Sequence, residues 1–218
     1  DRQGAVLLEY VPPQGEPQSM LISESHQFIF LAVPKTGSSS IEKALAPYRA
    51  PLTDEFKKHA TCSKLKRELP TGIWESYFKF AFVRNPYDFM QSWYFYRQRD
   101  ELANPKHPRH HLYTGYTSFE EFITTFARKE WLLPQVEWVA PAAMELQVQL
   151  DYVGRYETFE DDFRQICQRL AIPCPTLPTL RRSRNDAGAS KLWNSRTRAV
   201  VNDYFWQDFK AFGYEILR

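Results

Sequence analysis

The sequence FIFLAVPKTGSSS occupies residues 28–40 and decides the predicted fold. It starts with a continuous apolar run, Phe28–Val33, which is typical of a strand buried on both faces of a parallel sheet. The turn that follows leads into a helical stretch at Ile41–Leu45. Such a strand, turn and helix can hold a phosphate-like anion, because Gly37 lets the backbone approach closely and the helix start directs amides at the ligand.

The same order of strand, turn and helix recurs twice downstream. Phe78–Val83 predicts a second buried strand, with Pro86 as the first residue of a helix. Asp151–Tyr156 predicts a third strand, with Thr158 as the N-cap of the next helix. Strands that alternate with helices favour an α/β fold, here a three-layer, P-loop-like domain with a central parallel sheet flanked by helices.

Two more helices are predicted outside these repeats. Ser118 and Glu121 form a predicted capping box ahead of an apolar stripe with helical spacing. A last helix is expected from about Ser195 to Phe212, with Gly213 as its stop.

The composition excludes several functional classes. The chain has 218 residues with 28 basic and 26 acidic side chains, and its net charge of +2 is too even for a general nucleic-acid binder. It contains no run of roughly 18 or more apolar residues, so no membrane span is expected. The three cysteines form no C-x-x-C pair, which favours a cytoplasmic location.

We expect an irregular lead-in over residues 1–27 and a single domain over residues 28–218.

The turn at residues 34–40 is not a Walker A loop. That motif, G-x-x-x-x-G-K-[ST], places its lysine after the second glycine, whereas Lys35 precedes Gly37 by two residues. A P-loop nucleotide kinase, which needs the Walker lysine, is therefore a weaker alternative. A serine-capped turn with a solvated Lys35 and no ligand also remains open.

The order PKTGSSS at residues 34–40 resembles the 5′-phosphosulfate loop of sulfotransferases that use 3′-phosphoadenosine-5′-phosphosulfate (PAPS). The resemblance implies that Lys35 interacts with the bridging oxygen of the leaving phosphate. It also implies that the amides and hydroxyls of the loop hold the phosphosulfate. The expected donor ligands in the loop are Lys35, Thr36, Gly37, Ser38, Ser39 and Ser40.

A second candidate anion site lies in the sequence FVRNPYDFMQSWY at residues 82–94. Arg84 falls at the carboxyl end of a predicted parallel strand, where open α/β sheets bind ligands. Ser92 is about two turns into the next helix, and helical side chains lean back towards the helix start, so both residues could reach one phosphate. The segment resembles the 3′-phosphate motif of the same family, which implies that Arg84 and Ser92 bind that phosphate. The alternative is that Arg84 is an ordinary charged residue at a strand end and that Ser92 only fills space on an aromatic helix face.

The segment between the two motifs contains His59, a candidate general base. The arrangement resembles the Golgi-type carbohydrate sulfotransferases with a histidine base and their bacterial relatives, which implies that His59 takes the acceptor proton. Glu55 and Asp54 remain rival bases. The segments YVGRYE at residues 152–157 and FGY at residues 212–214 are also typical of this branch.

Two further segments have open roles. Arg182 and Ser183 lie where the family has a loop that closes over the nucleotide, although a solvated charged face is the alternative. Residues 97–116 are rich in basic and aromatic side chains. They could bind a sugar or an anionic polymer, or form an exposed loop with no role.

The predicted activity is transfer of a sulfuryl group from PAPS to a hydroxyl of an acceptor, with 3′-phosphoadenosine-5′-phosphate (PAP) as the other product and no metal. The resemblance implies a carbohydrate acceptor; a small-molecule or lipid alcohol is the alternative. A non-catalytic nucleotide- or glycan-binding module remains a rival function. Because the chain begins with Asp1 rather than Met, a Golgi-lumen location behind a removed anchor stays open beside the cytoplasm. The oligomeric state is not predicted.

Overall fold

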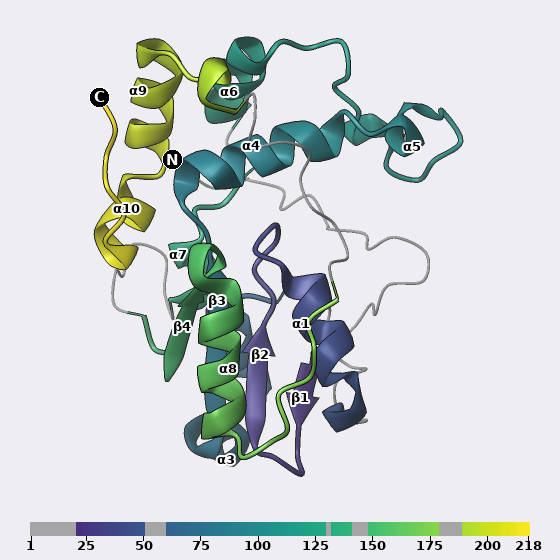
Figure 1. The fold of residues 1–218 in the computed structure, drawn as a ribbon, viewed down its shortest axis with the longest axis vertical. Coiled ribbons are helices and arrows are strands. Elements are labelled where there is room, and N and C mark those ends of the chain that lie inside the picture. The colour runs from purple at the N-terminus through teal and green to yellow at the C-terminus, as the bar shows by residue number, and fades with distance from the viewer. Residues whose placement is uncertain (1–20, 51–59, 130–131, 141–147, 179–188) are drawn as a thin grey trace. The chain divides into compact units, whose positions relative to one another are not determined.

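The computed structural model describes residues 21–50, 60–129, 132–140, 148–178 and 189–218 (Figure 1). These residues form two compact units. We call the described residues within 12–84 and 135–181 the sheet unit, and those within 85–134 and 182–218 the helical unit. Each unit combines separate stretches of the sequence, and the single domain expected over residues 28–218 stays a prediction.

The sheet unit is built on a four-stranded sheet with the strand order β1-β2-β3-β4. Its strands are β1 Leu21–Ser23, β2 Phe28–Leu31, β3 Phe78–Val83 and β4 Tyr152–Arg155. The strands β2, β3 and β4 are parallel, which confirms the predicted parallel sheet, whereas β1 runs antiparallel to β2. The strand β1 falls within the lead-in that was expected to be irregular.

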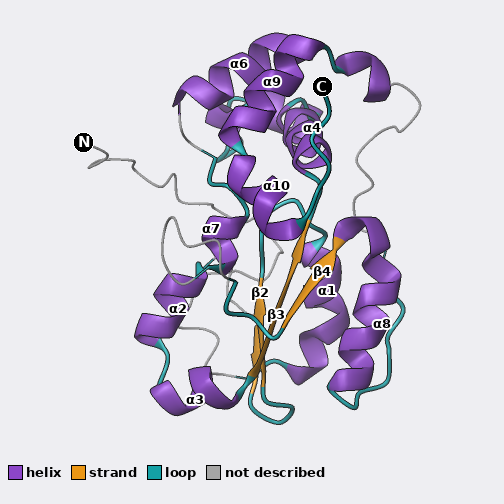
Figure 2. Cartoon of the chain, turned by 90° about the vertical axis from the view of Figure 1, so that its left-hand side faces the viewer, coloured by secondary structure: helices purple, strands orange, loops and turns teal. Residues whose placement is uncertain are grey.

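Helices cover both faces of this sheet (Figure 2). One face carries α1 Ser38–Leu45 and α8 Phe159–Arg169. The other carries α2 Cys62–Glu68, α3 Thr71–Ser76 and α7 Val136–Val139. The three predicted layers of the α/β fold are therefore confirmed.

The core between the sheet and the helices α1 and α8 is aromatic. Phe28 and Phe30 of β2 and Phe80 of β3 are fully buried and pack ring against ring. Burial of one such side chain contributes about 1.5–3 kcal/mol, so a few phenylalanines supply much of the driving force for this packing. The same core includes Ile41 and Leu45 of α1 and Phe163, Ile166 and Cys167 of α8.

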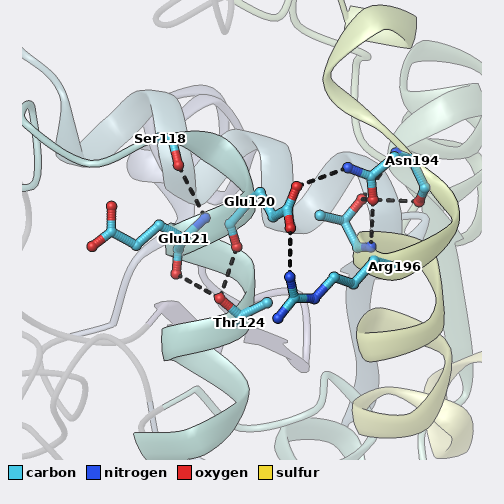
Figure 3. A network of polar contacts seen from close by, with 7 residues as sticks. Ser118, Glu120, Glu121, Thr124, Asn194 and Arg196 are labelled. Atoms are coloured by element: carbon cyan, nitrogen blue, oxygen red, sulfur yellow. Dashed lines mark hydrogen bonds and ion pairs between the residues drawn. The ribbon is translucent and has the colours of Figure 1, made fainter.

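The helical unit contains α4 Pro86–Arg97, α5 Asp100–Ala103, α6 Phe119–Lys129, α9 Ser195–Tyr204 and α10 Trp206–Phe212. Short 3-10 helices cover His110–Leu112 and Ala189–Leu192. Polar contacts join the first turns of α6 and α9, as Figure 3 shows: Glu120 accepts hydrogen bonds of 3.0 Å from Asn194 and from Arg196. Asn194 also caps α9 in a capping box with Thr197.

Several predicted helix boundaries are confirmed. Pro86 is the first residue of α4, and Gly213 ends α10 with a φ of 64°. The Ser118 hydroxyl accepts a hydrogen bond of 3.2 Å from the Glu121 amide at the start of α6. None of the helices among the described residues is both long and apolar enough to cross a membrane.

Thr158 occupies the predicted N-cap position of α8, but its side chain makes no capping hydrogen bond; its hydroxyl donates to the Asp162 carboxylate (2.6 Å). One boundary prediction is wrong. The expected single helix from Ser195 to Phe212 is divided at Phe205 into α9 and α10. The Phe205 ring is fully buried there, so the change of helix direction does not interrupt the apolar face.

Strand β2 ends two residues before the predicted boundary at Val33. The Val33 amide donates to the Leu31 carbonyl (3.1 Å), and this turn takes the chain out of the sheet and into the loop that precedes α1. Helix α1 in turn begins at Ser38, three residues before the predicted helical stretch. The segment that was predicted to bind an anion is therefore Pro34–Gly37 plus the first turn of α1.

Candidate functional site

The loop between β2 and α1 has an unusual backbone. Lys35 has a φ of 66° and Gly37 a φ of 84°, so both residues adopt the left-handed conformation. This conformation is easy for glycine but unfavourable for lysine, and such residues concentrate at functional sites. The Thr36 hydroxyl donates to the Val33 carbonyl (2.8 Å) and is fully buried, so it stabilises the turn itself.

The three predicted serine ligands form the first turn of α1, which follows the loop directly (Figure 1). The first amides of a helix have no partner within that helix, and the helix dipole adds positive potential there. The start of α1 is therefore suited to binding an anion. Ser38 is buried, and the Ser40 hydroxyl donates to the Pro178 carbonyl (2.9 Å), which ties α1 to the segment after α8.

The ring of Phe159 lies against Gly37. A Cβ atom at Gly37 would be 2.7 Å from the Cζ atom of Phe159, closer than two carbon atoms can pack. Phe159 in turn packs edge-on against Phe82 of β3, with 4.9 Å between the ring centroids. Position 37 therefore excludes a side chain both by its φ and by its surroundings.

Gly37→Ala should lower the free energy of unfolding by at least about 1–2 kcal/mol, the cost of a left-handed non-glycine residue. Displacement of the Phe159 ring adds to this cost. Gly72→Ala is the matched control, because a Cβ atom at Gly72 in α3 meets nothing within 4 Å. It should be neutral or stabilising by up to about 1 kcal/mol. Urea denaturation of both variants measures the difference, and equal effects would contradict the role given to position 37.

Arg84 follows the last residue of β3 and is held in two ways. Its backbone amide donates to the Gln135 Oε1 atom (2.8 Å), and its carbonyl accepts from the Gln135 Nε2 atom (2.7 Å). Its guanidinium carbon lies 4.1 Å from the centroid of the Tyr156 ring. Its Nε atom is buried and has no hydrogen-bond partner among the residues that the structure describes.

Arg84 therefore fits the expected phosphate ligand in its chemistry. A buried N–H group without a partner is costly, and a bound anion would remove that cost. Guanidinium groups also match phosphate through planar, paired donors.

Ser92, the second predicted phosphate ligand, lies on α4 in the helical unit and is buried. Arg84 belongs to the sheet unit. Convergence of the two side chains on one phosphate therefore stays a prediction. The candidate base His59 and its rivals Glu55 and Asp54 lie outside the described residues, and so do Arg182 and Ser183.

The basic segment at residues 97–116 is partly internal. Arg97 and Arg109 are both about 4% exposed, and burial lowers the pKa of Arg97. Arg109 donates a hydrogen bond to the Tyr96 hydroxyl. These two arginines are therefore structural parts of the helical unit, whereas Tyr116 is 84% exposed.

Sequence reasoning missed three residues that shape this site: Gln135, Tyr156 and Phe159. Tyr156 lies in the segment at residues 152–157 that was singled out as a strand end and as typical of the family branch, and Phe159 begins the helix expected after Thr158. Gln135 follows Pro134 just before α7, and no local pattern distinguishes it. Only its contact with a residue 51 positions away identifies it.

The sequence model of the sulfotransferase family matches residues 18–215, a stretch that includes the loop at residues 34–40 and the segment at residues 82–94. The chain belongs to the sulfotransferase family. The family predicted from the two motifs is thus confirmed.

Two curated relatives resemble this sulfotransferase chain weakly but over most of its length. Carbohydrate sulfotransferase 12 of Mus musculus is 24% identical over 258 residues, which cover 93% of this chain and 61% of the relative. Carbohydrate sulfotransferase 10 of Xenopus laevis is 22% identical over 238 residues, which cover 90% of this chain and 67% of the relative. The chain therefore spans about two thirds or less of the length of these relatives.

Proposed function

We propose that this protein is an enzyme that transfers a sulfuryl group from PAPS to a hydroxyl group of a carbohydrate. The observation that carries the proposal is the sulfotransferase-family match over residues 18–215. The geometry of the loop before α1 and the partnerless buried Nε atom of Arg84 within the described residues support it further. Both are features that an anionic nucleotide would use.

The donor would be held at its two charged ends. The loop amides, Lys35 and the hydroxyls of the first α1 turn would bind the phosphosulfate. Arg84 and Ser92 would bind the 3′-phosphate, and Arg182 and Ser183 would contact the nucleotide from a segment outside the described residues. When bound, PAPS supplies the sulfuryl group.

The protein residues would then do two things. Lys35 would neutralise the negative charge that develops on the leaving phosphate oxygen, and this contribution grows as the bond to sulfur lengthens. His59 would accept the proton of the attacking hydroxyl, which requires a neutral imidazole. In-line transfer of this kind depends mainly on positioning and on electrostatic stabilisation.

The carbohydrate acceptor is supported by the names of the two relatives, which are both carbohydrate sulfotransferases. Small-molecule and lipid alcohols are the alternatives. Incubation with radiolabelled PAPS and a panel of glycans, lipids and phenols tests the proposal. We expect the label to be transferred to a glycan. Transfer only to phenols or lipids would show that the acceptor is not a carbohydrate. No transfer to any member of the panel would contradict the proposed activity. The cytoplasmic location stays a prediction.

PAP should bind at least about tenfold more tightly than AMP, because Arg84 and Ser92 would pair with the additional phosphate. Tenfold corresponds to about 1.4 kcal/mol, which one charge-assisted hydrogen bond supplies. Arg84→Ala should remove the preference, measured by calorimetry. Arg164→Ala is the control, since Arg164 is 56% exposed on α8 and forms a local ion pair with Asp161. Equal binding of PAP and AMP by the wild type would contradict the 3′-phosphate site, and tightest binding of ATP with magnesium would favour a kinase.

A further inference from the structure

The peptide of Arg84 is fixed by a side chain rather than by a neighbouring strand. The pairing of β3 with β4 ends at Val83 and Arg155, so Arg84 lies just beyond the ladder. The Gln135 amide supplies one acceptor and one donor to the Arg84 backbone and thus replaces the missing strand partner. Because Gln135 is fully buried, these hydrogen bonds form away from water, where loss of a partner is costly.

The guanidinium group of Arg84 is fixed by an aromatic ring. At 4.1 Å from the centroid, its carbon lies over the Tyr156 ring, in a cation–π contact. The N–H donors of a guanidinium lie in its plane, and a ring at this distance covers one side of the group without using any donor. Tyr156 therefore orients Arg84 without using its Nε–H donor, which has no partner among the described residues.

Tyr156 itself belongs to a firmly held turn. It begins the 3-10 helix Tyr156–Thr158 between β4 and α8. The Asp162 carboxylate accepts three hydrogen bonds around this turn: from the Tyr152 hydroxyl (2.7 Å), from the Arg155 amide (2.8 Å) and from the Thr158 hydroxyl (2.6 Å). Burial and the bond to Asp162 raise the pKa of Tyr152, so its phenol keeps the proton that it donates.

We propose that Gln135 and Tyr156 are positioning residues that hold Arg84 in its phosphate-binding orientation before the nucleotide arrives. This inference rests on the proposed function, in which Arg84 binds the 3′-phosphate. A side chain that is already ordered loses little conformational entropy on binding. Loss of the Tyr156 ring or of the Gln135 amide should therefore weaken recognition of the 3′-phosphate and leave recognition of the 5′ end unchanged.

The first test compares PAP and AMP binding in matched variants by calorimetry. Tyr156→Leu should weaken PAP binding roughly three- to tenfold, the range expected for one cation–π contact, while AMP binding stays within about twofold of the wild type. Tyr156→Phe should restore the wild-type ratio, because the ring and not the hydroxyl makes the contact. Tyr48→Leu is the control, since the Tyr48 ring packs against His26, with 4.7 Å between the ring centroids.

Gln135→Met provides a second route to the same effect if Tyr156→Leu fails to fold. Methionine fills a similar volume but makes neither hydrogen bond to Arg84. It should reduce the PAP preference over AMP several-fold. Circular dichroism and thermal unfolding of each variant separate this specific loss from loss of the fold, which would weaken the binding of both nucleotides alike.

The second test needs no nucleotide. In a 15N-labelled protein, the Nε–Hε signal of Arg84, assigned by its absence in Arg84→Lys, should be displaced by the ring current of Tyr156. The displacement should persist in Tyr156→Phe and vanish in Tyr156→Leu. An unchanged signal and an unchanged PAP-to-AMP ratio in Tyr156→Leu would overturn the inference. If Arg84→Ala still prefers PAP over AMP, then Arg84 does not bind the 3′-phosphate. This result would contradict the proposed function on which the inference rests, independently of the NMR signal.

Discussion

Lys35→Ala is expected to lower turnover by about 10²–10³-fold, the usual cost of one lost group that stabilises developing charge. The affinity for PAP should fall by less than about tenfold, because the Lys35 charge matters most when the leaving oxygen becomes anionic in the transition state. The kcat and the dissociation constant of PAP measure the two effects separately. Alanine retains a Cβ atom, so the backbone at φ 66° is strained equally in both proteins and the comparison isolates the ammonium group.

Lys43→Ala is the matched control for Lys35. Lys43 is exposed in the last turn of α1, at the far end of the helix from the loop, and its loss should leave turnover unchanged. A Lys35→Ala variant with normal kcat and a raised KM for PAPS would contradict the catalytic role. Lys35 would then be a residue that binds the ground state and the transition state equally.

His59→Ala is expected to lower turnover by about 10²–10⁴-fold, the usual contribution of a positioned proton acceptor. PAPS affinity should change little, because the base faces the acceptor. The wild-type rate should fall as the pH drops through the histidine pKa, about 6.5 when unperturbed, since only the neutral ring accepts a proton. The variant should lose this acid limb. A pH profile of kcat for both proteins measures the effect.

His26→Ala is the control for this substitution. His26 lies in the turn between β1 and β2, where its Nδ1 atom contacts the Ser25 hydroxyl at 2.9 Å, and it should contribute nothing to the acid limb. An acid limb that survives in active His59→Ala would place the base elsewhere, with Glu55 and Asp54 as the next substitutions. Circular dichroism distinguishes loss of the base from loss of the fold.

The sequence predicts the central strands and the loop well because their signals are local. Phe28–Leu31 is a continuous apolar run and Phe78–Val83 is apolar except for Lys79, and such runs are typical of strands buried on both faces of a sheet. Pro86 and Gly213 mark helix ends through their own backbone preferences. The confirmed fold class and family follow from these short segments.

The features that sequence reasoning missed depend on distant contacts or on very short elements. Strand β1 has three residues, too few for any pattern. The apolar spacing continues through Phe205, so it hides the break between α9 and α10. The Thr158 hydroxyl donates to the Asp162 carboxylate, which also accepts from Tyr152 and Arg155, and no local pattern predicts this network. Gln135 lies 51 positions from Arg84 in the sequence, and only the folded chain brings the two residues into hydrogen-bonding contact.

The turn between β4 and α8 touches both predicted ends of the donor site. Phe159 lies against Gly37 in the loop expected to bind the phosphosulfate, and three residues earlier Tyr156 lies against Arg84. This short stretch therefore sets the separation between the two predicted anion-binding sites. An insertion or deletion within residues 156–159 would change that separation, so this turn should tolerate changes of side chain far better than changes of length.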